Sequence, residues 1–147
     1  MHGLPRPRYV TCGEAAPALG LQIQMTLNAS TAVEIDEAFA TLARERPDAL
    51  FVAGEAFFVS QRAQLAALTS RQQIPSTYSV RGPVVAGGLM SYGSDLAAMF
   101  HQVGVYTGNI LKGAKPAELP VLQSTKFDFV INLKTARGAV NAALDCR

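Results

Sequence analysis

Groups of polar and aromatic residues follow three short apolar or strand-like stretches of the chain. A carboxylate can accept hydrogen bonds from an amine, a guanidinium can form a bidentate pair with a carboxylate, and an aromatic ring can stack on an organic group. These residue types predict non-covalent binding of a small organic solute, without a catalytic step. The candidate ligand-binding residues are Glu55, Phe57, Tyr78, Arg81, Ser91, Tyr92 and Asp95.

Each candidate also has a purely structural interpretation. Glu55 can be a solvated loop carboxylate, and Phe57 can pack on the domain. Arg81 can be an ordinary surface charge, because most arginines are exposed. Ser94 or Asp95 can cap a following helix, although free amides at a helix start can also hold an anion.

Other kinds of chemistry lack the residues they need. Cys12 and Cys146 lie near opposite ends of the chain, and His2 and His101 are the only histidines. No metal-ligand spacing follows from these positions, so neither a metal nor a catalytic site is expected. His101 fits a structural role. The glycine pair at 87–88 precedes its strand and lacks the G-x-G-x-x-G spacing, so no cofactor is indicated.

Composition and charge are those of one compact domain. The chain has 147 residues, 49% of them hydrophobic, and a mean hydropathy of +0.17, which is enough to bury a core. Its net charge of +2 comes from 13 basic and 11 acidic residues without a run of like charges, so nucleic acid is not an expected partner. The first 13 residues contain no apolar run of signal-peptide length, and no segment reaches the length of a membrane span.

Strand and helix patterns alternate along the chain. Residues 21–27 alternate apolar and polar side chains, as a half-buried strand does, and residues 49–53 form an uninterrupted apolar run, typical of a strand covered on both faces. Further strands are predicted at 76–80, 88–92 and 127–133. Thr31 and Glu34 form a capping box that begins a helix ending before Pro47. Further helices are predicted at 59–73, from Ser94 or Asp95 to Lys112, and at 135–144.

This order predicts an α/β fold of three layers, with a mainly parallel sheet and helices on both faces. Residues 1–13 are expected to be a divergent tail, and residues 14–147 a single lobe. In such sheets ligands bind beyond the carboxyl ends of the strands. The candidate residues follow three of the predicted strands, so we expect them to line one crevice.

From about residue 15 to residue 137 the sequence resembles the C-terminal lobe of ABC transporter substrate-binding proteins, in the group related to aromatic amino-acid binders. These proteins have a type I periplasmic-binding fold. The resemblance rests on the order and spacing of several motifs: EIDEAF at 34–39, AGGLMSYG at 86–93, ILKGAKP at 110–116 and VINLKTA at 130–136.

The resemblance implies a two-lobed extracytoplasmic receptor that closes on a solute and docks on a membrane permease. A family member is roughly twice as long, and its N-terminal lobe and signal peptide have no counterpart in these residues, so the location is left open. The leading interpretation is a solute-binding module for an amino-acid-like or other small organic solute. The alternative is an oligomeric structural or interaction protein without solute binding, because half a cleft leaves a ligand exposed.

The resemblance also implies a strand and a helix that precede residues 21–27 in the chain, and residues 1–13 do not match them. In a doubly wound sheet this first strand lies between the strands predicted at 21–27 and 49–53. Tyr9-Val10-Thr11 has strand character. A parallel crossover needs about 10–12 residues, however, and the stretch 13–20 is shorter and contains Pro17. Unpaired strand edges recruit other chains, so we expect a homo-oligomer, with exchange of N-terminal segments as one route.

Overall fold

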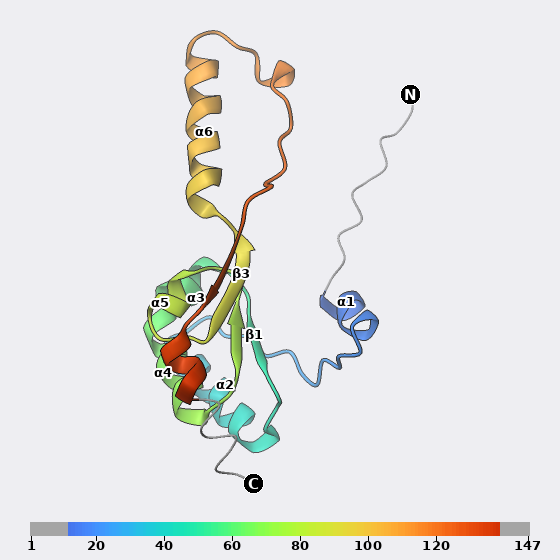
Figure 1. Ribbon diagram of the computed structural model, residues 1–147, viewed down its shortest axis with the longest axis vertical. Helices are drawn as coiled ribbons and strands as arrows, with labels where there is room; N and C mark the ends of the chain where they lie inside the picture. Colours follow the sequence, from blue (N-terminus) through green and yellow to red (C-terminus); the bar gives the residue numbers. More distant parts are fainter. Residues whose placement is uncertain (1–11, 139–147) are drawn as a thin grey trace.

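A four-stranded sheet organises residues 12–138, the part of the chain that the computed structural model describes (Figure 1). Its strands stand in the order β1-β2-β3-β4, with β1 to β3 parallel and β4 antiparallel to β3. The predicted α/β fold with a mainly parallel sheet is confirmed. The strands are β1 (Leu50–Val52), β2 (Ser76–Tyr78), β3 (Met90–Ser94) and β4 (Phe127–Ile131).

The predicted helices are present, with local differences. The helix predicted at 59–73 is divided at Gln61, and a short helix replaces the expected turn after Arg81. Residues 133–138 are helical, and the rest of the helix predicted at 135–144 lies outside the described residues. The helices are α1 (Cys12–Ala18), α2 (Ala32–Glu45), α3 (Ala56–Ser60), α4 (Arg62–Gln72), α5 (Gly82–Val85), α6 (Leu96–Leu111) and the 3-10 turn η1 (Pro116–Glu118).

The capping box at the start of α2 is formed as predicted. The Thr31 hydroxyl accepts a hydrogen bond from the Glu34 amide at 3.2 Å. The Glu34 carboxylate in turn accepts one from the Ser30 amide at 2.6 Å. Two amides that would otherwise lack a helical partner are thereby satisfied, which fixes where α2 begins.

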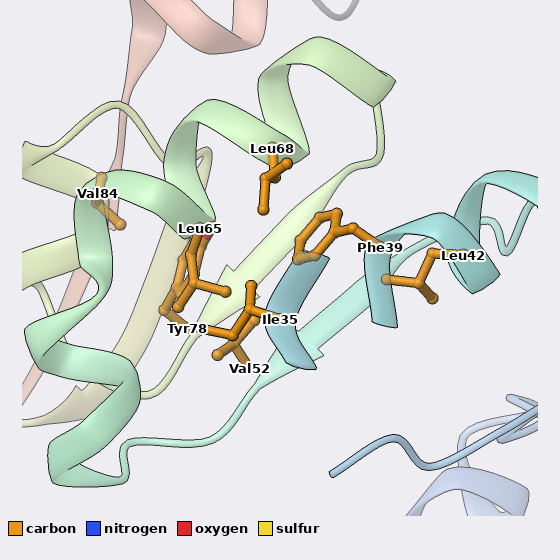
Figure 2. Packing of buried hydrophobic residues seen from close by; sticks show 8 residues of the cluster. All are labelled: Ile35, Phe39, Leu42, Val52, Leu65, Leu68, Tyr78 and Val84. Atoms are coloured by element: carbon orange, nitrogen blue, oxygen red, sulfur yellow. The ribbon is translucent and has the colours of Figure 1, made fainter. Parts of the chain in front are cut away.

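The core lies between α2, α4 and one face of the sheet. Figure 2 shows side chains from these elements and from α5 converging on Tyr78, which is 1% exposed. The Tyr78 hydroxyl lies 3.4 Å from that of Thr69, so its polar end has a partner inside the core. The core cluster is Ile35, Phe39, Leu42, Val52, Leu65, Leu68, Tyr78 and Val84.

The opposite face of the sheet remains open. Phe51 alternates with buried Val52 and is 54% exposed, and Tyr92 and Phe129, which pair across β3 and β4, are 59% and 60% exposed. Among residues 12–138, the helices α2, α4 and α5 contribute to the core on the Tyr78 side, and these rings on the other face stay exposed. The second helical layer predicted from the sequence is therefore not formed over them.

The prediction of a strand at 21–27 is wrong. These residues are assigned no strand, and Leu21 and Ile23 are 62% and 46% exposed, although Met25 packs against the core. A strand needs a hydrogen-bonded neighbour, and the described sheet ends at β1. Alternation shows which side chains a strand would bury, but it does not supply the neighbouring strand.

The predicted boundary between a tail and a lobe at residue 13 falls inside α1, which begins at Cys12. Residues 1–11 and 139–147 lie outside the described part of the chain, and so does the strand considered at Tyr9-Val10-Thr11. Within residues 12–138, none of the helices combines the length and the apolar character needed to cross a bilayer.

Residues 95–126 form an arm that stands away from the sheet (Figure 1). The helix α6 leaves the end of β3, and the chain returns through η1 to the start of β4. The Tyr106 hydroxyl donates a hydrogen bond to the Pro120 carbonyl and so ties the two limbs together. No residue of α6 is buried.

Candidate functional site

The three parallel strands end at one edge of the sheet, and this edge is the candidate site. The register pairs Val52 with Tyr78 and Tyr78 with Ser91, so residues at similar distances beyond these positions come together. Glu55 precedes α3, Arg81 precedes α5, and Asp95 precedes α6. The structure thus brings the predicted polar groups to the same edge, as expected for a parallel sheet.

Glu55 and Arg81 are charged groups of this edge that solvent can reach. Both are exposed, and neither side chain caps the helix that follows it. Their carboxylate and guanidinium can therefore bind a ligand without first breaking a cap. One group accepts hydrogen bonds and the other donates them, which suits a solute that carries both an ammonium and a carboxylate group.

Aromatic side chains flank the same edge. Tyr92 is 59% exposed and stacks on Phe127, with ring centroids 5.7 Å apart and planes 9° apart. Phe57 is half-buried, packs against the core and lies 5.6 Å from Phe58 between ring centroids. Tyr92 therefore offers a broad apolar surface, and Phe57 offers a partial one.

Two predicted residues face the core instead of the edge. Tyr78 and Ser91 are each 1% exposed, and Tyr78 has its hydroxyl beside Thr69. The two residues are paired in register on the covered face of the sheet, and burial leaves neither a surface for a solute. They support the strands but are not part of the site that we propose.

Asp95 has a structural task at this edge. Its carboxylate accepts a hydrogen bond from the Ala98 amide at 3.0 Å, which caps α6. The backbone amide of Asp95 also donates a hydrogen bond to the Lys126 carbonyl, at the base of the arm. Asp95 therefore caps α6, as its structural interpretation predicted. Any contact with a solute would be made in addition to this cap.

Ser79 forms the floor of the edge and was not among the predicted residues. A Cβ placed on Gly54 would lie 2.5 Å from the Ser79 hydroxyl oxygen, and a Cβ on Gly93 would overlap the Ser79 carbonyl group. The ends of β1, β2 and β3 therefore meet at Ser79, and positions 54 and 93 have no room for a side chain. The signal in the sequence was a glycine beyond or within each flanking strand, at positions 54 and 93.

The edge is an open surface. A depression of about 510 Å³ lies at the opposite edge, where Ser76 and Leu89 mark the starts of β2 and β3. A solute held by Glu55, Arg81 and Tyr92 would keep one side exposed unless a second body covered it. Among residues 12–138 no group of three His, Cys, Asp or Glu side chains is placed to hold a metal ion.

The sequence matches one family model over most of its length. A family model described as ABC transporter substrate binding protein matches residues 11–140. No curated protein sequence shows a significant match.

Solved structures share the fold. A conserved domain protein from Vibrio cholerae O1 biovar El Tor is 21% identical with a TM-score of 0.75, over 86% of this chain and 42% of its own. The ABC domain in complex with L-Trp from Streptococcus pneumoniae is 27% identical with a TM-score of 0.73, over 83% of this chain and 42% of its own. A substrate-binding protein with adhesive properties from Clostridium difficile, in a ligand-free, open structure, is 21% identical with a TM-score of 0.62. The match covers 86% of this chain and 42% of that protein.

The chain thus spans less than half the length of these neighbours. The region that the family model matches includes the strand ends and the arm.

Proposed function

Because this chain belongs to the family of ABC transporter substrate-binding proteins, we propose that it is a solute-binding module whose strand-end edge supplies one wall of the binding site. The solute is a small amino-acid-like molecule, held without catalysis. The observation that supports the proposal is that Glu55, Arg81 and Tyr92 stand at or beyond the carboxyl ends of neighbouring parallel strands and are all exposed. Arg81 binds the carboxylate of the solute, Glu55 its ammonium group, and Tyr92 its side chain.

The family and one neighbour support this class of solute. Substrate-binding proteins bind small molecules, and the streptococcal neighbour is a complex with L-Trp. The stacked pair of Tyr92 and Phe127 is suited to an aromatic side chain. In this proposal an ABC permease is the eventual partner, and it is reached through a second lobe.

A second candidate function is a structural or interaction protein without solute binding. The openness of the edge favours it, because a single wall buries too little of a small ligand to hold it tightly. Self-association is part of both candidate functions. The free edge of β1 and the exposed rings of Phe51 and Phe129 are surfaces that a second copy can cover.

A thermal-shift screen with the common amino acids tests the solute-binding proposal. A ligand at a hundred times its dissociation constant stabilises the protein by about 2.7 kcal/mol, or roughly 5–10 °C for a domain of this size. We expect such a shift with at least one amino acid, and we expect Arg81→Ala to abolish it. Arg71→Ala is the matched control, because Arg71 is exposed in the last turn of α4, away from the edge.

The two candidate functions separate clearly in this screen. Melting temperatures that stay flat across all amino acids would exclude the receptor function and favour the structural one. A melting-temperature shift that persists in Arg81→Ala would show that the solute binds somewhere other than the strand-end edge. The protein without solute should melt at the same temperature in both arginine variants, since neither guanidinium supports the core.

A further inference from the structure

A second exposed arginine, Arg62, lies beside the start of α5. It is the first residue of α4, whereas Arg81 directly precedes α5 at the strand-end edge. A Cβ placed on Gly82 would lie 3.7 Å from the Cδ atom of Arg62. The aliphatic stem of Arg62 therefore runs past the residue that follows Arg81, and both arginine side chains are exposed. The fold thus makes two arginines from separate helices neighbours at this edge.

Neither arginine is paired with a carboxylate in the described part of the chain. Among residues 12–138, the ion pair with nitrogen and oxygen within 4.0 Å is the one between Lys115 and Glu118. Arg62 donates a hydrogen bond to the Val59 carbonyl at 3.4 Å, which is longer than the usual range of about 2.7–3.2 Å. The side chain of Arg81 does not cap α5. Because a guanidinium carries five N–H donors, most donors of both groups remain available to a ligand.

We propose that Arg62 and Arg81 together bind one oxyanion, a carboxylate or a phosphate-type group. Two neighbouring cations repel each other, and an anion between them replaces this repulsion by two attractions. A carboxylate has about four lone-pair sites for hydrogen bonds. One guanidinium can bind it in bidentate fashion, and the second can fill the remaining sites. The planar fork of arginine suits this geometry better than the point charge of lysine.

The acidic residues of the edge leave the oxyanion site accessible. The carboxylate of Asp95 is engaged by the Ala98 amide, and within residues 12–138 Glu55 forms no ion pair with either arginine. The edge therefore offers a cationic pair for an acid group and a separate carboxylate for an amine. In the proposed function, Arg62 becomes the second residue that holds the carboxylate of the solute. This consequence rests on the proposed function, whereas the oxyanion site itself is measured without an amino acid.

Titration with inorganic phosphate at constant ionic strength tests the oxyanion site. The Nε–Hε NMR signals of the arginines report on each guanidinium directly. We expect the signals of Arg62 and Arg81 to shift along one saturation curve. Arg62→Gln should weaken the phosphate binding seen at Arg81 by about 10-fold, because it removes charge-assisted hydrogen bonds. Arg71→Gln is the matched control, since Arg71 is an exposed arginine at the other end of α4, and it should leave phosphate binding unchanged.

Arg62→Lys separates charge from geometry. It keeps the positive charge but lacks the fork, so its affinity for phosphate should fall between those of the unmodified chain and Arg62→Gln. Without phosphate, Arg62→Gln and Arg71→Gln should melt at the same temperature, because both side chains are exposed. The proposal would be overturned by unmoved signals of Arg62 and Arg81, by separate saturation curves for the two, or by an Arg81 response that is the same in Arg62→Gln.

The source of the oxyanion is tested with amino acids. By isothermal titration calorimetry, Arg62→Gln should lower the affinity for each amino acid that binds by about 10-fold. Each such amino acid should bind more tightly than its aminophosphonic analogue, because the added negative charge of the phosphonate would lie at the same edge as Glu55. Tighter binding of the analogue would contradict the assignment to a carboxylate. A phosphate response together with a flat amino-acid screen would support the oxyanion site and exclude the proposed function, so the two failures are distinguishable.

Discussion

Replacing Gly93 with alanine is expected to lower the free energy of unfolding by about 3 kcal/mol. The added Cβ would overlap the backbone carbonyl group of Ser79, which directly follows the neighbouring strand β2. A backbone group in a sheet cannot rotate aside as a flexible side chain can, so β2 and β3 must separate for the methyl group to fit. Urea unfolding followed by circular dichroism measures the change.

Gly108→Ala is the control for this substitution. Gly108 lies inside α6, and a Cβ there would meet nothing within 4 Å. Alanine is favoured over glycine within a helix by about 1 kcal/mol, so this variant should be at least as stable as the unmodified chain. Equal stability of Gly93→Ala and the unmodified chain would show that the strand ends are not in close contact at Ser79.

Truncating Phe39 should have a larger effect, a loss of about 4 kcal/mol in the free energy of unfolding. Phe39 is 3% exposed and lies on α2, within the cluster that contains Leu65, Leu68 and Tyr78 (Figure 2). Alanine at this position truncates the largest of the three buried side chains of α2 and leaves a cavity between α2 and α4. The measurement is again the midpoint and slope of urea unfolding.

Phe51→Ala is the matched control, because it makes the same chemical change on the open face of the sheet. Phe51 is 54% exposed, so its truncation should cost less than about 1 kcal/mol. A loss at Phe51 as large as the loss at Phe39 would contradict the arrangement, since it would mean that the open face is covered in solution. If that loss depended on protein concentration, it would identify self-association as the cover.

Local sequence signals predicted the elements that build the core. The apolar run at 49–53 became β1, and the capping box of Thr31 and Glu34 began α2 as predicted. These signals act over a few residues, through hydrogen bonds and the burial of one face. These local interactions do not depend on contacts with distant parts of the chain.

Signals that depend on a distant neighbour failed. The alternation at 21–27 describes a strand, but the neighbouring strand that would satisfy its backbone is not present in the described sheet. The helix predicted up to Lys112 is likewise present as α6, but the structure leaves its apolar side chains exposed to solvent. A sequence pattern records what an element is built to bury, and only the structure shows whether a partner is present.

The candidate site was predicted at the level of the sheet edge and less well at the level of single residues. The rule that ligands meet strand ends located Glu55, Arg81 and Tyr92. It could not tell that Tyr78 points into the core, because that depends on which residues of β2 share the face of Val52. Ser79 was missed because its importance comes from the lack of side chains on its neighbours.

A solute site at the strand ends can be tested by NMR titration of the isotope-labelled chain with L-tryptophan and then with the other amino acids. We expect changes in amide chemical shift concentrated at residues 54–57, 79–82 and 92–95, and these changes should saturate as the site fills. Shifts confined to the depression lined by Thr69, Ser76 and Asn132 would place the solute at the opposite edge of the sheet. That result, or unchanged shifts with every amino acid, would contradict a solute site at the strand ends.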